Sequence, residues 1–124
     1  MKMIDWYKPC AYNEPQKHLF HREARKRLHA LAEALCLPRH AYDVRSNKGG
    51  VAVSGEVTLH ADHIYVQVCQ PATGADSGIL IRTCKGRKDY SGGPNNFAPL
   101  SDLDGIERLA GHCQRVLARE GGQL

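Results

Sequence analysis

Two amphipathic helical patterns on either side of a run of alternating residues constrain the fold of this 124-residue chain more than any other feature. Apolar residues recur at intervals of three or four between residues 20 and 35, and again between residues 103 and 117. That interval is the period of one face of an α-helix. From residue 42 to residue 84, apolar and polar residues alternate in several short runs, as they do in strands that bury one face. Packing both helices on one face of a sheet would bury all of these apolar faces.

The helix boundaries are marked by capping residues and prolines. Asn13 suits the N-cap position, Gln16 stands at the reciprocal position of a capping box, and Pro15 is tolerated in a first turn. Pro38 is expected to end this helix, because a proline disfavours the helical conformation of the residue before it. The second helix is expected to begin after an N-cap at Ser101.

Four strands are expected, at residues 42–45, 51–59, 64–68 and 78–84. In the second of them Val51 and Val53 share a face with Val57 and Leu59, while Gly55 indicates a bulge or the close approach of another backbone. Short connections between the strands favour an antiparallel meander. We therefore expect an α+β fold: a helix, a four-stranded antiparallel meander sheet and a second helix, packed as a two-layer sandwich. Residues 1–124 would form one domain, with residues 1–12 as an N-terminal extension.

Charge and hydropathy exclude some classes of protein. The net charge of +4 argues against an acidic mimic of DNA and permits contact with nucleic acid or with an acidic protein surface. The N-terminus has no apolar signal-peptide core, and no window approaches the 18 or so apolar residues of a membrane span. We therefore expect a soluble, intracellular protein.

The five cysteines are scattered and odd in number, so we expect reduced thiols rather than a disulfide framework. Neither they nor the histidines show the spacing of a metal site, and we expect no metal or cofactor. A nucleophilic pair of Cys84 or Cys69 with His60 or His63 is conceivable across neighbouring strands. No recognised catalytic motif accompanies it, so an enzyme is the minority hypothesis.

Two basic surfaces are candidates for partner binding: the polar face of the first helix, and the irregular stretch from residue 85 to residue 99 with the strand end before it. Cations interleaved with aromatic residues can bind phosphates and stack on bases, or face an acidic protein. The alternatives are a solvated helix face, and aromatic residues that fasten a long loop to the core. The candidate partner-binding residues are Arg22, Arg25, Lys26, Arg82, Lys85, Arg87, Lys88, Tyr90 and Phe97.

Three segments carry a resemblance: Gly49 to His60 (GGVAVSGEVTLH), Ile64 to Val68 (IYVQV) and Arg82 to Tyr90 (RTCKGRKDY). They resemble small accessory proteins of bacterial phages, plasmids and integrative elements, over about half of the chain. No catalytic motif comes with this likeness. It implies a context in which such proteins inhibit host defence, anti-CRISPR proteins among them, by binding rather than by catalysis.

Two functions follow as hypotheses. The first is a non-enzymatic inhibitor of the anti-CRISPR kind that blocks a surface of a CRISPR effector subunit by protein–protein contact. The alternative is a nucleic-acid-binding accessory or regulatory protein of a mobile element, although no helix-turn-helix or zinc finger is present in the sequence. An exposed sheet face or edge would also allow a homodimer.

Overall fold

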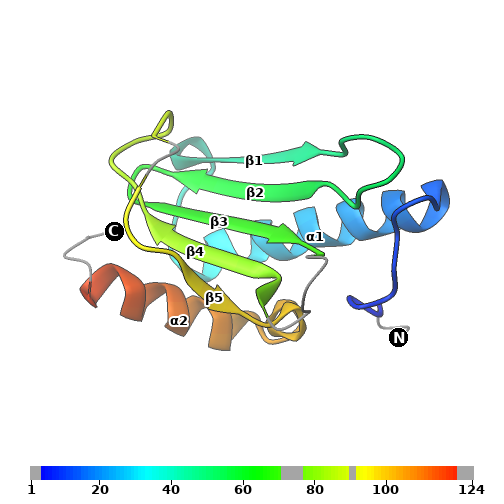
Figure 1. The fold of residues 1–124 in the computed structure, drawn as a ribbon. Coiled ribbons are helices and arrows are strands. Elements are labelled where there is room, and N and C mark those ends of the chain that lie inside the picture. Colours follow the sequence, from blue (N-terminus) through cyan, green and yellow to red (C-terminus); the bar gives the residue numbers. More distant parts are fainter. Residues whose placement is uncertain (1–3, 71–76, 90–91, 120–124) are drawn as a thin grey trace.

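The computed structural model describes residues 4–70, 77–89 and 92–119, and it confirms the α+β class and the helix–sheet–helix order (Figure 1). The sheet has five strands rather than the four expected, in the order β1-β2-β3-β4-β5, and every neighbouring pair is antiparallel. The elements in chain order are α1 (Glu14–Ala34), the 3₁₀ turn η1 (Arg39–Ala41), β1 (Tyr42–Asn47), β2 (Glu56–Ala61), β3 (Ile64–Cys69), β4 (Ile79–Thr83), β5 (Asn96–Ala98), the 3₁₀ helix η3 (Leu100–Asp104) and α2 (Ile106–Arg119).

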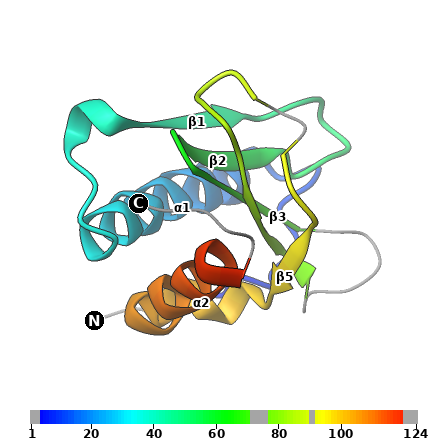
Figure 2. The ribbon, with the colours of Figure 1, turned by 90° about the vertical axis from the view of Figure 1, so that its left-hand side faces the viewer.

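Both helices lie side by side on one face of the sheet, so the molecule has two layers (Figure 2). The side chains of Val57 and Leu59 on β2 face the helices and are fully buried. Leu59 lies opposite Val44 of β1 and Val66 of β3, and Val66 lies opposite Ile81 of β4. Because side chains alternate along a strand, residues 43, 45, 56, 58, 60, 65, 67, 69, 80, 82 and 97 belong to the opposite face, here called the outer face.

The first helix begins as expected and ends earlier than expected. The Asn13 side chain accepts a hydrogen bond from the Gln16 backbone N–H at 3.1 Å, and a proline occupies the first turn. The helix ends at Ala34, so Pro38 is not the residue that ends it. Cys36 adopts a left-handed conformation (φ 61°), and Leu37 N–H bonds back to the Ala32 carbonyl, which is the pattern of a Schellman cap.

The predicted strand over residues 51–59 is wrong in its first half. Strand β2 begins at Glu56, which pairs with Asn47, the last residue of β1. Residues 48–55 therefore form a loop, here called the β1–β2 loop, and Val51 and Val53 are exposed rather than buried in the sheet. The expected close backbone approach at Gly55 is present: its φ is +78°, and a Cβ there would lie 2.3 Å from the Asn47 carbonyl oxygen.

Two further boundaries differ from the sequence prediction. Strand β5 lies within the stretch expected to be irregular, because three residues are too few to show an alternating pattern and they pair with β4 only in the folded chain. At the second helix, the residues after Pro99 first form η3, and α2 starts only at Ile106, after Gly105. Ser101 is therefore not the N-cap of α2.

Candidate partner-binding site

The N-terminal segment, residues 4–13, is fastened to one end of the sheet by a single side chain. Gln70, directly after β3, donates from Nε2 to the carbonyl oxygens of Trp6 and Lys8 at 2.9 and 2.8 Å. Its Oε1 accepts from the backbone N–H and the thiol of Cys10 at 3.3 and 3.2 Å. One amide thus pairs polar groups of the segment at three alternate positions, residues 6, 8 and 10, and fastens the segment to the end of β3.

The β1–β2 loop is held at the same end of the molecule by three donors. The backbone N–H of Tyr12 bonds the Val51 carbonyl at 2.7 Å. From α1, Lys17 Nζ donates to the Gly50 carbonyl at 2.6 Å, and His21 Nε2 donates to the Ser54 carbonyl at 2.7 Å. Both side chains are buried. Burial lowers the pKa of His21, so the ring is neutral near pH 7 and its Nε2 carries the proton.

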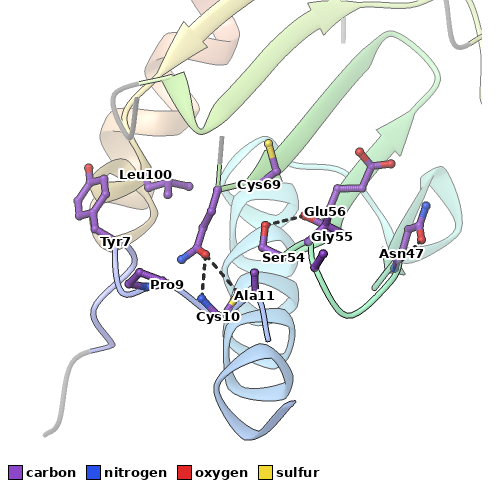
Figure 3. A pocket seen from close by; sticks show the side chains of 14 residues that line it. Tyr7, Pro9, Cys10, Ala11, Asn47, Ser54, Gly55, Glu56, Cys69 and Leu100 are labelled. Atoms are coloured by element: carbon purple, nitrogen blue, oxygen red, sulfur yellow. Dashed lines mark hydrogen bonds between the residues drawn. The ribbon is translucent and has the colours of Figure 1, made fainter. Parts of the chain in front are cut away.

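A cavity of about 650 Å³ lies between these two segments (Figure 3). Its volume falls within the range of about 300–1,000 Å³ that is usual for ligand pockets. Residues of the N-terminal segment form one side and residues of the β1–β2 loop the other (Figure 3). The lining residues are Tyr7, Pro9, Cys10, Ala11, Asn47, Gly49, Ala52, Val53, Ser54, Gly55, Glu56, Cys69, Gln70 and Leu100.

Exposed apolar side chains are concentrated on the two segments that border this cavity, and two of them, Tyr7 and Val53, line it. The described residues include five large hydrophobic side chains that are exposed, and four of them belong to these two segments: Tyr7, Tyr12, Val51 and Val53, here called the apolar rim. Tyr12 is 75% exposed and also has a left-handed backbone, with φ at 63°. Contiguous exposed apolar surface of this kind marks interaction sites in soluble proteins.

The predicted basic face of α1 is exposed but largely paired. Arg22 and Lys26 both contact the Glu23 carboxylate, at 3.5 and 3.3 Å. Arg25 instead reaches the edge strand β1, where it donates to the Val44 carbonyl at 3.2 Å. Its side chain therefore covers a backbone group of a sheet edge, a place where unpaired groups invite unwanted pairing.

In the predicted basic loop after β4, one of the cations is also paired within the protein. Arg87 pairs with Asp43 at 3.2 Å and with Asp62 at 3.4 Å, and it donates to the His40 carbonyl. The Lys85 and Lys88 side chains are exposed. Arg87 is thus a structural residue that joins the loop to β1 and to the β2–β3 turn.

The remaining predicted residues do not complete one surface with these cations. The Arg82 guanidinium lies 4.5 Å from the centre of the Tyr65 ring on the outer face. Phe97 is 54% exposed on β5, so it does not fasten the loop to the core. The sheet order places β5 four strand spacings, about 19 Å, from β1, to which Arg25 and Arg87 bind. Tyr90 lies outside the described residues.

The apolar rim was missed because Val51 and Val53 were assigned to the buried face of a strand. A signal was nevertheless present in the sequence. Gly49, Gly50 and Gly55 bracket the two valines, and glycines at both ends of so short a run favour a loop over a strand. The tyrosines at positions 7 and 12 lie in the segment treated as a mere extension, where no periodic pattern assigns them a face.

The hypothetical nucleophilic pair finds no geometric support. The Cys84 thiol donates to the Ala61 carbonyl at 3.2 Å, and burial raises its pKa. Burial likewise raises the pKa of Cys69. His60 Nε2 bonds the Gly86 carbonyl at 2.9 Å, and burial lowers its pKa. An activated thiol requires the opposite, a depressed pKa beside a base.

Within the three described ranges, no three His, Cys, Asp or Glu side chains converge as a metal-binding group. In the same part of the chain, no helix combines the length and the apolar character needed to cross a bilayer. The sequence matches no protein-family model, and comparisons with curated proteins and with solved structures found no significant match. The site is therefore interpreted from its own geometry.

Proposed function

We propose that the protein acts by binding rather than by catalysis, and that it docks a partner protein on the apolar rim and the cavity beside it. The observation that carries this proposal is that four of the five exposed large hydrophobic side chains in the described part of the chain belong to the two segments that border one cavity, two of them, Tyr7 and Val53, lining it. Apolar side chains that leave water on docking contribute about 25 cal/mol per Å² of buried surface. A few such anchors in and around a pocket supply most of the affinity of a typical interface.

The site is organised before any partner arrives. Three hydrogen bonds hold the β1–β2 loop, and the Gln70 amide holds the N-terminal segment. A preformed surface loses little conformational entropy on binding. The left-handed backbone of Tyr12 supports the same interpretation, because that conformation costs a residue of this type about 1–3 kcal/mol. With its side chain 75% exposed, packing does not explain why a tyrosine stands there.

For the partner, we propose a subunit of a host defence complex such as a CRISPR effector, which the protein would inhibit in the cytoplasm of its bacterial host. The support is the resemblance of residues 49–60, 64–68 and 82–90 to accessory proteins of mobile elements. Steric inhibition needs a rigid surface of sufficient size and no catalytic group, and the two fixed segments around the cavity supply such a surface.

The test measures phage plating on a panel of bacteria that each carry one active CRISPR system. Wild-type protein should raise plating on at least one of them by tenfold or more. The double variant Val51→Ser/Val53→Ser should lose that effect, since both side chains are exposed and their replacement leaves the core intact. Phe97→Ser is the matched control, an exposed apolar residue that does not line the cavity.

Three results would contradict parts of this proposal. No change of plating with wild-type protein on any strain would reject the anti-CRISPR role. Full inhibition by the double valine variant would reject the apolar rim as the docking surface. Loss of inhibition in Phe97→Ser alone would instead locate the interface at the β5 edge of the sheet, where Phe97 is a partner-binding candidate predicted from the sequence.

Nucleic-acid binding is the second candidate, and one observation favours it: Lys85 and Lys88 are exposed, and Arg82 stacks on an aromatic ring of the outer face. Against it, acidic partners neutralise much of the remaining basic surface, through Glu23, Asp43 and Asp62. A nucleic-acid binder should lose affinity steeply as salt rises. Binding to a mixed-sequence DNA or RNA that falls steeply between 50 and 200 mM salt, and is lost in Lys85→Glu/Lys88→Glu, would favour this candidate.

A further inference from the structure

Glu56 is the one charged side chain among the described residues that line the cavity. Glu56, the first residue of β2, is partly buried and lies between Asn47 of β1 and Cys69 of β3 on the outer face. Figure 3 shows the Glu56 and Cys69 side chains directed to the same side of the sheet. Within the described residues, the side-chain carboxylate of Glu56 forms no hydrogen bond and no ion pair.

The neighbouring polar groups are already used. The Gln70 amide makes four hydrogen bonds to the N-terminal segment. The Asn47 side chain accepts from the Gly49 N–H at 3.1 Å, and the Ser54 hydroxyl donates to the Gly55 carbonyl at 3.4 Å. The carboxylate of Glu56 is therefore the charged acceptor that the described lining leaves without a hydrogen bond.

No cation of the described chain lines the cavity. Arg45, which is on the outer face two residues before Asn47, pairs with Asp43 at 3.3 Å. The buried Lys17 amine is directed to the Gly50 carbonyl. A cationic group from outside would therefore meet a carboxylate that no described cation pairs with.

The walls of the cavity define the rest of the occupant. Pro9, Ala11, Val53 and Leu100 present apolar surface, which suits an aliphatic stem that carries its charge at the tip. Guanidinium binds a carboxylate through two parallel hydrogen bonds and gives up its water more readily than ammonium does. We propose that the cavity accepts an arginine side chain of the partner protein, with Glu56 as its counter-ion. This inference rests on the proposed docking function and specifies the chemistry of the partner.

The test uses N-acetyl-L-arginine methylamide as the probe, with the citrulline analogue as its neutral isostere and the lysine analogue as the ammonium form. Titration of ¹⁵N-labelled protein should shift the amide resonances of residues 10, 53–56 and 69–70 with the arginine probe. The citrulline probe should shift them much less, and the lysine probe should bind at least threefold more weakly. Glu56→Gln should weaken arginine binding at least fivefold, whereas Glu107→Gln, an exposed acid on α2, should leave it unchanged.

Equal shifts with citrulline, equal binding of lysine, full binding to Glu56→Gln, or no saturable shift at probe concentrations up to 50 mM would each overturn the arginine assignment. None of these results touches the proposed function, because the phage-plating test depends on the apolar rim. If the double valine variant loses inhibition while Glu56→Gln retains it, the partner docks on the rim without an arginine in the cavity.

Discussion

Gln70 and Cys10 are joined twice, because one side-chain oxygen of Gln70 accepts both the backbone N–H and the thiol of Cys10. The two residues are sixty positions apart in the chain. Through the same amide, the carbonyl groups of Trp6 and Lys8 also gain a donor. Gln70, the residue directly after β3, thus holds the N-terminal segment, which carries two tyrosines of the apolar rim.

Replacing Gln70 by alanine should therefore loosen the N-terminal segment and destabilise the protein. The loss of donors and acceptor for partly buried backbone groups is expected to cost about 1–3 kcal/mol. Urea denaturation measures the free energy of unfolding, and hydrogen exchange at the Cys10 amide reports on the segment itself. Gln114→Ala, at an exposed position of α2, is the control. Unchanged protection of Cys10 in Gln70→Ala would show that other contacts hold the segment.

A second prediction concerns the glycines of the β1–β2 loop. Gly55→Ala should lower the free energy of unfolding by about 2 kcal/mol or more, because a left-handed alanine is strained and its Cβ would collide with the Asn47 carbonyl. Gly50→Ala provides a matched control, since nothing lies within 4 Å of a Cβ there and its φ is not positive. Similar stability of the two variants would contradict the described loop conformation.

A third prediction separates two adjacent cations of the predicted basic loop. Arg87→Glu should destabilise the protein by about 1–3 kcal/mol, because it removes two ion pairs and places a carboxylate beside Asp43 and Asp62. Lys88→Glu changes an exposed residue and should alter the free energy of unfolding by no more than about 0.5 kcal/mol. Thermal or urea unfolding of both variants measures the change in the free energy of unfolding. Equal changes would mean that Arg87 does not fasten the loop to the sheet.

These residues show where sequence reasoning succeeds and where it stops. The N-cap at Asn13 and the apolar faces of the two helices were predictable because they depend on neighbours three or four positions away. For the loop at Val51 and Val53 the flanking glycines were the sole local signal, because three of its carbonyl groups are bound by Tyr12, Lys17 and His21, which are distant in the chain. A local pattern of alternating valines carries no information about those bonds.

The predicted basic surfaces are partly paired within the fold, for a related physical reason. A count of charges along the chain registers Arg22, Lys26 and Arg87 but not the carboxylates that the fold brings against them. An ion pair reduces the field that a partner would meet. Conversely, nothing in the sequence distinguishes Glu56, and it becomes a candidate because it lines a cavity in which the described residues place no cation beside it.

The stability of the fold should depend on pH through His21. Burial lowers the pKa of this histidine in the folded protein, and the nearby charges of Lys48 and Lys17 act in the same direction. The unfolded chain, with an ordinary pKa near 6.5, therefore takes up a proton at a pH where the folded state does not. The contribution of His21 is intact above about pH 6.5 and is lost as the pH falls from there toward its folded pKa.

Urea denaturation at pH 7.5 and pH 5.0 measures this effect, and the wild-type protein should be less stable at the lower pH. His21→Gln can still donate to the Ser54 carbonyl but does not titrate, so it should show a smaller difference between the two pH values. Burial also lowers the pKa of His29, His60 and His112, so part of the dependence should remain. A variant with the full wild-type dependence would exclude His21 as a contributor.

The last prediction orders the cysteines by their reactivity. Cys36 is exposed at the end of α1, whereas Cys113 is buried on α2, where burial raises the pKa of its thiol to about 12. Only the thiolate reacts with iodoacetamide, so at pH 8 about one Cys113 thiol in ten thousand is competent even before its burial is considered. Limited alkylation followed by peptide mass spectrometry should therefore find Cys36 modified first, and Cys113 only after urea unfolds the chain. Burial raises the pKa of Cys69 and Cys84 as well, so neither should outpace Cys36. If either of them did, a thiolate nucleophile would regain support and the binding-only proposal would have to be abandoned.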